Sequence, residues 1–224
     1  MCAQNTKLLK NKELIMHELV TVRPDNFVDV ADYIPTIETD VKYYSGDNFV
    51  GERIEGYNAP IILITRETAE ALKAAQSKLM TKGYCLRVYD GYRPQRAVEH
   101  FLRWKDRPET GITKARHYPD FTKAEVFDEG FIAARSTHTR GSTVDLTVVD
   151  MRNGQELDMG GFFDYFEESS YSNYTDLTAI QSRNRMMLKY LMLSCGFEPF
   201  FQEWWHFTLS NEPYPNTYFD FEIQ

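Results

Sequence analysis

Two short segments of the chain carry side chains that together could hold a catalytic metal ion. The first, residues 136–145, contains His138 and Asp145, and the second, further along the chain, contains Glu203 and His206. Two imidazoles and one carboxylate supply three ligands, which leaves the fourth position of a zinc ion open for water, as in catalytic sites. Glu203, three residues before His206, is placed to take a proton from that water. These residues predict one zinc ion (Zn²⁺) per chain and a hydrolytic reaction.

Each of these residues also has an ordinary structural interpretation. Asp145 could be a solvent-facing residue of a strand, since threonines alternate with it. A histidine among aromatic residues, as His206 is, is often a satisfied core residue, and Glu203 alone could be a surface acid. The order His-x₆-Asp followed by Glu-x₂-His favours the metal site over these three separate interpretations.

The spacing of His138 and Asp145 requires a turn between them. They are seven residues apart, and on one uninterrupted strand such residues point to opposite faces. Gly141 lies between them and predicts a turn or bulge that brings both side chains to one metal.

The periodicity of apolar residues predicts three helices. They are expected over residues 67–82, 95–104 and 176–195, the first capped by Thr65 and ended by Gly83. Gly196 is expected to end the last helix. The apolar residues of that last helix are expected to face inward, namely Ile180, Met186, Met187, Tyr190 and Leu191.

Strands are expected over residues 84–89, 143–149 and 204–209. The middle strand alternates, which places Thr143, Asp145, Thr147 and Val149 on one face. Residues 36–58 are expected to form loop with short strands, and residues 105–135 to be irregular. Because strands and helices mix without regular βαβ alternation, the predicted fold class is α+β.

The composition fits one globular domain. The chain has 224 residues, of which 42% are hydrophobic and 14% aromatic, with a net charge of -8. An acidic balance argues against nonspecific binding to nucleic acid, which requires clustered Lys and Arg. No apolar run is long enough to span a membrane.

The three cysteines indicate neither a thiolate metal site nor a disulfide framework, because none stands in a CxxC pair. Cys85 and Cys195 are expected to be buried free thiols. The start of the chain shows no apolar segment of a secretory signal. Cys2 would fit a trimmed lipoprotein as well as an accidental surface cysteine, so both a cytoplasmic and a periplasmic location stay open, as does the oligomeric state.

Four motifs resemble those of the D-alanyl-D-alanine dipeptidases of the vancomycin-resistance type. These belong to a group of zinc D,D-peptidases that also includes D,D-carboxypeptidases and the hedgehog signalling domain. The resemblance covers residues 40 to 209. It is carried by Asp90-Gly91-Tyr92-Arg93-Pro94, Ser136-x-His138-x-x-Gly141-x-Thr143-x-Asp145, Gly161-Phe162-Phe163-Asp164 and Glu203-Trp204-Trp205-His206. Thr143 replaces the alanine usual in the family.

The resemblance implies a fold and a role for each catalytic residue. The fold would be a single domain over residues 31–224, with a mixed, mostly antiparallel sheet and flanking helices, after a leader over residues 1–30. His138, Asp145 and His206 would hold the zinc. Glu203 would be the general base, and Arg93 would stabilise the oxyanion, although Arg93 could also form a structural ion pair in its turn.

The resemblance further implies a pocket for the amine of a small D,D-dipeptide. Ser136, Asp164 and Tyr43 occupy the corresponding positions of the family. Ser136 could instead be a local turn residue, Asp164 a helix cap or surface acid, and Tyr43 a core residue.

Three functions are compatible with these residues. The first is zinc-dependent hydrolysis of D-alanyl-D-alanine, in cell-wall peptide metabolism. The second is a D,D-carboxypeptidase or other peptidoglycan peptidase that acts on longer peptides. The third is a non-enzymatic zinc-binding domain. The doubled tryptophan Trp204-Trp205, together with Asp164, favours the first over the second, and the presence of both Glu203 and Arg93 disfavours the third.

Overall fold

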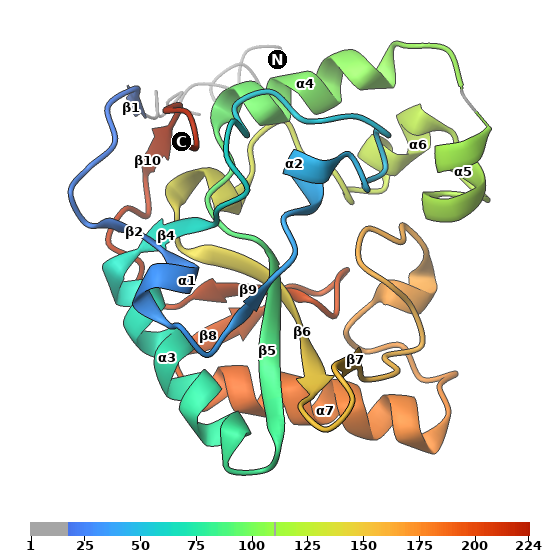
Figure 1. The fold of residues 1–224 in the computed structure, drawn as a ribbon. Helices are drawn as coiled ribbons and strands as arrows, with labels where there is room; N and C mark the ends of the chain where they lie inside the picture. Colours follow the sequence, from blue (N-terminus) through green and yellow to red (C-terminus); the bar gives the residue numbers. More distant parts are fainter. Residues whose placement is uncertain (1–17, 110) are drawn as a thin grey trace, which may run out of the picture.

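A mixed sheet lies at the centre of the computed structural model, which describes residues 18–109 and 111–224 (Figure 1). Within these residues the sheet has six strands in the order β3-β5-β6-β9-β8, with β7 added beside β6. The strands are β3 (Glu38–Thr39), β5 (Tyr84–Asp90), β6 (Thr143–Asp150), β7 (Gln155–Glu156), β8 (Phe197–Pro199) and β9 (His206–Leu209). Only the β3–β5 pair of this sheet is parallel. The arrangement confirms the predicted α+β class and the mostly antiparallel sheet.

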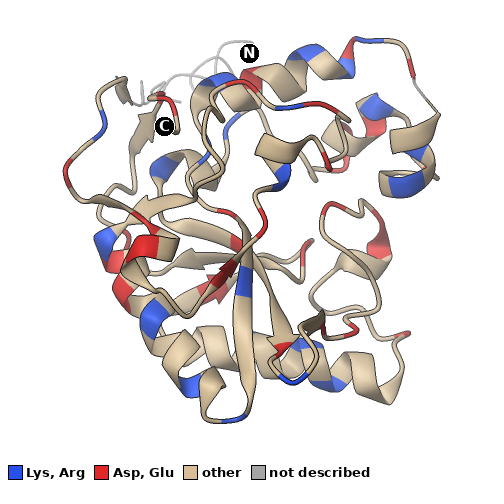
Figure 2. Ribbon diagram, viewed as in Figure 1, with Lys and Arg blue, Asp and Glu red and all other residues tan. Residues whose placement is uncertain are grey.

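An ion pair fixes the edge of this sheet. Figure 2 shows the acidic β3 beside a basic segment of β5, where Glu38 stands opposite Arg87. The Arg87 Nη2 lies 2.6 Å from the Glu38 Oε2, and the Arg87 Nη1 lies 2.9 Å from the Glu156 Oε1 of β7. One guanidinium therefore links the two short strands that flank the sheet.

Two small strand pairs lie beside the main sheet. β2 (Phe27–Asp29) runs antiparallel to β4 (Leu63–Thr65), and β1 (Glu18–Val20) runs parallel to β10 (Thr217–Phe219). The first 17 residues of the predicted leader lie outside the described residues, and the rest of it forms β1, β2 and the start of α1. The boundary at residue 30 stays a prediction.

The helices lie on two sides of the sheet. α3 (Arg66–Met80) and α7 (Ala179–Leu193) contact each other on one side, and α4 (Gln95–Lys105) lies at the opposite end of the molecule (Figure 1). The shorter helices are α1 (Val30–Tyr33), α2 (Lys42–Ser45), α5 (Ile112–His117) and α6 (Lys123–Asp128), with 3₁₀ turns η1 (Thr137–Arg140) and η2 (Glu168–Ser170). No described helix is long and apolar enough to cross a membrane.

The helix ends follow from local capping. The Thr65 hydroxyl accepts a hydrogen bond from the Thr68 N–H at the start of α3, as predicted, and Gly83 follows its end with φ +81°. α7 begins at Thr178, whose side chain forms a reciprocal capping box with Gln181.

The predicted inward face of α7 was partly wrong. Ile180, Met186 and Tyr190 are exposed, whereas Met187 and Leu191 pack against the core. Asn184 and Arg185 are buried instead, because they donate hydrogen bonds to the backbone carbonyls of loops packed against the helix. Buried carbonyl groups need hydrogen-bond donors, and this requirement outweighs the general preference for apolar residues on the buried face of a helix.

Three further expectations were wrong. Residues 105–135 include two short helices, α5 and α6, and the capping box of Thr122 with Glu125 marks the second. The last predicted strand begins only at His206, and β10 follows it. Cys195 is half-buried, whereas Cys85 is buried as expected.

The turn predicted at Gly141 is present. Gly141 ends η1 with φ +81°, and a Cβ atom at this position would lie 2.4 Å from the Phe27 ring. That ring packs edge-on against the rings of Tyr92, Phe219 and Phe221. Only glycine satisfies both the left-handed backbone and the close approach, so Gly141 fixes how η1 passes into β6.

We predict that Gly141→Ala destabilises the protein more than Gly83→Ala does. Both glycines have φ +81°, but no atom lies within 4 Å of a Cβ on Gly83. The left-handed conformation should cost about 1–2 kcal/mol in each variant, and overpacking against Phe27 about 1–3 kcal/mol more in Gly141→Ala. Urea unfolding of both variants measures the difference, and equal midpoints would contradict the role given to Phe27.

Candidate metal centre

Three side chains from separate elements converge on one point. His138 lies on η1, Asp145 on β6 and His206 on β9, and Asp145 stands directly opposite His206 in the β6–β9 register. Their ligand atoms all lie within 4.8 Å of one another. The His138 Nε2 is 3.1 Å from the Asp145 Oδ2 and 3.3 Å from the His206 Nδ1, which is 3.2 Å from the Asp145 Oδ1.

The surrounding hydrogen bonds fit a metal at this point. The His138 Nδ1 lies 2.7 Å from the Gly91 carbonyl, to which it donates, and this hydrogen bond orients the ring so that its Nε2 faces the cluster. The His206 Nε2 lies 3.2 Å from the Thr137 hydroxyl. Among the described residues, the contact of the buried Asp145 Oδ1 is the ion pair with the His206 Nδ1 at 3.2 Å. Two ring nitrogens and a carboxylate oxygen that face one another are a donor set that a divalent cation accepts.

The electrostatics of the cluster favour positive charge. Asp145 is 2% exposed, and its burial raises its pKa, but His138 and His206 outweigh burial and hold that pKa well below its usual range. Burial lowers the pKa of His206, but hydrogen bonds to Asp145 and Glu203 raise it to about 9. Both shifts show that the cluster stabilises a cation beside Asp145.

Arg93 lies at the edge of the cluster and is held by Asp90. Its Nε donates to the Asp90 Oδ2 at 2.9 Å, and its Nη2 lies 3.4 Å from the Asp145 Oδ2. The guanidinium also lies over the Tyr43 and Phe101 rings, at 4.9 and 5.4 Å from their centroids. The structural ion pair considered from the sequence is thus present, and it orients Arg93 toward the cluster.

Asp90 is a supporting residue whose role was not predicted from the sequence. It is 1% exposed, accepts a hydrogen bond of 2.7 Å from the Tyr57 hydroxyl, and pairs with Asp145 across a bulge in the β5–β6 register. Asp90 is the first residue of the Asp-Gly-Tyr-Arg-Pro motif, and this position in the motif could have identified it as a site residue. The next residue, Gly91, has to be glycine, because a Cβ atom at this position would lie 2.7 Å from the Leu63 carbonyl oxygen.

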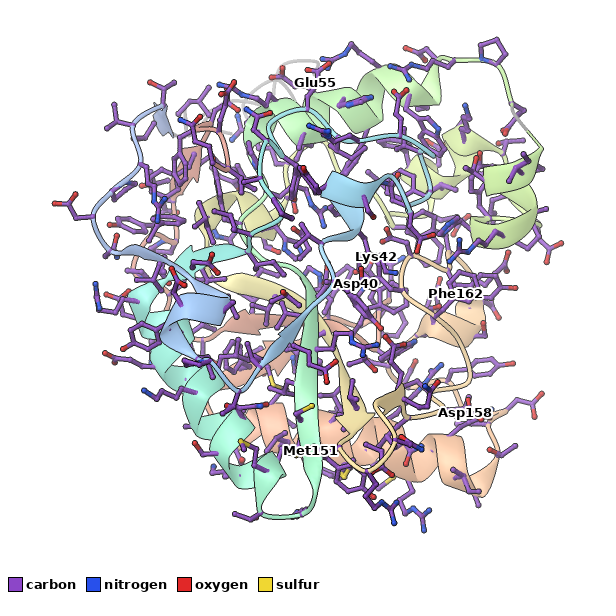
Figure 3. The ribbon with its side chains drawn as sticks, viewed as in Figure 1. Asp40, Lys42, Glu55, Met151, Asp158 and Phe162 are labelled. Atoms are coloured by element: carbon purple, nitrogen blue, oxygen red, sulfur yellow. The ribbon has the colours of Figure 1, made fainter. Side chains whose placement is uncertain are left out.

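A buried carboxyl group lies near Arg93. Asp164 is 4% exposed and accepts a hydrogen bond from the Tyr43 hydroxyl at 3.1 Å. It belongs to the loop after β7, on which Asp158 and Phe162 are labelled in Figure 3. Burial raises the pKa of Asp164 well above its usual range, against the opposing effect of Arg93.

The backbone of Asp164 is strained and held in place. Its φ is +60°, and among the described residues no other non-glycine residue has a positive φ. The His117 Nδ1 donates to the Asp164 carbonyl at 2.9 Å, and the Phe166 N–H donates to the His117 carbonyl. Burial lowers the pKa of His117 to about 4, so its ring is neutral. Such strain persists where neighbouring contacts fix it, often at functional sites.

Ser136 has the turn role that the sequence left open. Its hydroxyl caps η1 by accepting a hydrogen bond from the His138 N–H at 3.3 Å. This bond holds the first histidine in position, and the same side chain also lines the cavity described next.

One cavity of about 210 Å³ joins these groups. All eight residues predicted from the sequence line it, namely Tyr43, Arg93, Ser136, His138, Asp145, Asp164, Glu203 and His206. Glu203 is 8% exposed, and its Oε2 lies 3.3 Å from the His206 Nδ1. Aromatic rings form much of the remaining wall, including Phe49, Phe101, Phe131, Phe166 and Phe200. A small polar molecule would therefore meet the cluster of His138, Asp145 and His206, two further acids and two arginines, Arg93 and Arg135, in one cavity.

The chain is similar to known proteins over most of its length. A family model described as D-ala-D-ala dipeptidase (Peptidase_M15) matches residues 23–224. The chain is 46% identical over 198 residues to a D-alanyl-D-alanine dipeptidase of Streptomyces coelicolor, and 38% identical over 198 residues to one of Enterococcus faecium. It is 39% identical over 199 residues to one of Enterococcus faecalis. These matches cover 88%, 88% and 89% of this chain and 98% of each relative.

We predict that Asp145→Asn removes tight binding of a divalent transition metal. The variant loses the one anionic ligand, so the affinity should fall at least about 100-fold. Thermal unfolding after chelation and readdition of metal measures it, because a ligand at 100 times its Kd stabilises by about 2.7 kcal/mol. Asp150→Asn, on the same strand and paired with Arg152, is the control that should behave as the native protein. An equal metal-dependent shift in both variants would contradict the site.

Proposed function

Because the chain belongs to the D-ala-D-ala dipeptidase family, we propose that it hydrolyses the dipeptide D-alanyl-D-alanine to two molecules of D-alanine with the help of zinc. The observation that carries this proposal is the single cavity in which the His138, Asp145 and His206 cluster meets Glu203 and Asp164. A metal held by the cluster could act on the peptide bond, and the buried Asp164 could bind the free amine of a dipeptide.

Zinc is the metal that this ligand set favours. Two imidazoles and one carboxylate are ligands that zinc accepts in catalytic sites, and the hydrogen bond from the His138 Nδ1 to the Gly91 carbonyl orients the His138 Nε2 toward the other two ligands. When bound, zinc supplies a Lewis acid for the substrate carbonyl and lowers the pKa of a water molecule. His138, Asp145 and His206 would hold it.

Glu203 is proposed as the general base. It lies beside His206 at the cavity wall, largely shielded from solvent. Its carboxylate takes a proton from the attacking water and then delivers that proton to the leaving amine, so one group serves both halves of the reaction.

Arg93 is proposed to stabilise the negative charge that develops on the carbonyl oxygen. Its guanidinium is fixed by Asp90 and by the rings of Tyr43 and Phe101 before substrate arrives. Charge that is already oriented costs no reorganisation during the reaction, and this is the main source of such stabilisation.

Asp164 and Tyr43 are proposed to bind the free ammonium of the substrate, with Ser136 at the same wall. A cation beside Asp164 favours the ionised carboxyl group over the neutral one that burial favours. An acylated or longer peptide has no ammonium group there and would lack the ion pair with Asp164, at a cost in binding. This argues for the dipeptidase over a carboxypeptidase of longer peptides, and the presence of Glu203 and Arg93 argues against a non-enzymatic zinc domain.

We predict that Glu203→Gln lowers kcat by about 10²–10⁴ because it removes general acid–base catalysis. Zinc content should stay at one ion per chain, since the three proposed ligands are unchanged. Metal analysis and single-turnover hydrolysis of D-alanyl-D-alanine measure the two quantities. The exposed Glu198 of β8 offers the matched control Glu198→Gln, which should keep full activity. Activity retained in Glu203→Gln would show that another group is the base.

We predict that the protein cleaves D-alanyl-D-alanine in strong preference to its N-acetyl derivative. Asp164→Asn should lower kcat/KM for the free dipeptide by roughly 30-fold or more, equivalent to about 2 kcal/mol for a lost buried charge pair. It should change the rate for the acetylated peptide much less. Asp47→Asn, at an exposed acid that pairs with Lys42 and Arg116, is the control. Comparable rates for both peptides in the native protein would overturn the assignment of the amine pocket.

A further inference from the structure

The proposed dipeptide carries a second charge for which the site described above has no assigned partner. A dipeptide has a carboxylate at its C-terminal end as well as an ammonium group at its N-terminal end. Asp164 is the proposed partner of the ammonium group, and Arg93 that of the oxyanion of the cleaved bond. A carboxylate that leaves water without a partner costs free energy, so a further cation in the cavity would improve binding.

Arg135 is a cation of this cavity that is free to take that role. Of the described lining residues none is a lysine, and the arginines are Arg93 and Arg135. Arg93 is already paired with Asp90 and Asp145, at 2.9 and 3.4 Å. Arg135 forms no ion pair with an acid of the described parts of the chain, and its guanidinium carbon lies 5.4 Å from the centre of the Tyr218 ring. A ring attracts a cation without neutralising it, so the charge stays available for an anion.

The contacts across the cavity give its groups an order. The Tyr43 hydroxyl lies 3.1 Å from the Asp164 Oδ2 and 3.5 Å from the Arg93 Nη2, which in turn lies 3.4 Å from the Asp145 Oδ2. The proposed amine partner thus comes first, the oxyanion partner next and the metal cluster third. Along a dipeptide the ammonium group and the cleaved carbonyl follow each other in the same order.

Beyond the cluster, the contacts lead toward Arg135. The Asp145 Oδ1 lies 3.2 Å from the His206 Nδ1, and the His206 Nε2 lies 3.2 Å from the Thr137 hydroxyl. Thr137 stands two residues after Arg135, and both line the cavity. In a dipeptide the carboxylate likewise lies beyond the cleaved carbonyl, so Arg135 stands where the C-terminal end of the substrate is expected.

The groups proposed for the two ends of the substrate differ in exposure. Tyr43 and Asp164 are 1% and 4% exposed, whereas Arg135 is an exposed residue and Phe200, which lines the same cavity, is 37% exposed. A carboxylate held by an exposed arginine keeps part of its hydration, so the pairing costs little desolvation. The carboxylate belongs to the alanine that leaves after cleavage, and an exposed partner allows this product to depart into solvent.

We propose that Arg135 binds the C-terminal carboxylate of the dipeptide, an inference that rests on the proposed function. The guanidinium donates N–H bonds to the two carboxylate oxygens. Together with Asp164 it selects a molecule in which both ends are free and charged. The carboxylate does not change during cleavage, so Arg135 binds the substrate and the transition state alike, and its loss raises KM and leaves kcat unchanged.

Steady-state kinetics of the zinc-loaded protein on D-alanyl-D-alanine and on D-alanyl-D-alaninamide, which lacks the carboxylate, test this role. Arg135→Gln should raise KM for the dipeptide about three- to tenfold, and Arg135→Glu should raise it further. KM for the amide should change less than about twofold in Arg135→Gln and should not rise in Arg135→Glu. Arg183→Glu changes the net charge equally at an exposed residue of α7 that lines none of the described cavities, and should leave both KM values unchanged.

The outcomes distinguish this inference from the proposed function. If the native protein cleaves the dipeptide but Arg135→Gln changes KM for both substrates equally, or for neither, Arg135 is not the carboxylate partner and the proposed function stands. If the native protein does not cleave the dipeptide, the proposed function fails, and calorimetric titration of the zinc-loaded protein with D-alanyl-D-alanine decides. Weaker binding to Arg135→Gln than to the native protein would then support the inference, and equal affinity or no binding would overturn it.

Discussion

The structure depends on one buried carboxylate. Asp145 lies in the central strand of the sheet, 2% exposed, where an isolated negative charge would be very costly. The elements around it supply positive charge or donors: η1 brings His138, β9 brings His206, and the turn after β5 brings Arg93. Gly91 and Gly141 allow the close backbone approaches that this convergence requires. The core is thus arranged around the compensation of one buried negative charge.

The sequence predicted best those features that are local. Alternation, capping and glycine stops located β5, β6, α3 and α4 to within a few residues, because these signals act over one or two turns of chain. The eight site residues came from short motifs, and the structure brings all of them to one cavity. Residue types and spacing predicted four of them, His138, Asp145, Glu203 and His206, whereas the resemblance to a known family supplied Tyr43, Arg93, Ser136 and Asp164. Their separate roles are part of the proposed function.

Features that depend on distant partners were not predictable from one sequence. The apolar residues of α7 suggested an inward face, yet Asn184 and Arg185 are buried because carbonyls of Asp158, Met159 and Tyr171 need donors. No pattern within the sequence of the helix indicates that distant carbonyls require these hydrogen-bond donors. Likewise β1 and β10 are three residues each and exist through their pairing with each other, across nearly the whole chain. Asp90 holds Arg93 in place and His117 holds the backbone of Asp164, and such supporting roles cannot be recognised from residue type alone.

The left-handed backbone of Asp164 limits which substitutions this position could accept during evolution. Among residues with a side chain, Asp and Asn adopt a positive φ most readily, whereas longer side chains seldom do. Glutamate would keep the charge and lose the conformation, and asparagine would keep the conformation and lose the charge. Asp164→Glu, which lengthens the side chain at constant charge, is therefore disfavoured, whereas Asp164→Asn, which replaces the carboxylate by a neutral amide, is compatible with the backbone. If Asp164 binds the substrate amine as proposed, the first change at this position in a lineage that drifts toward substrates without a free amine is expected to be to asparagine.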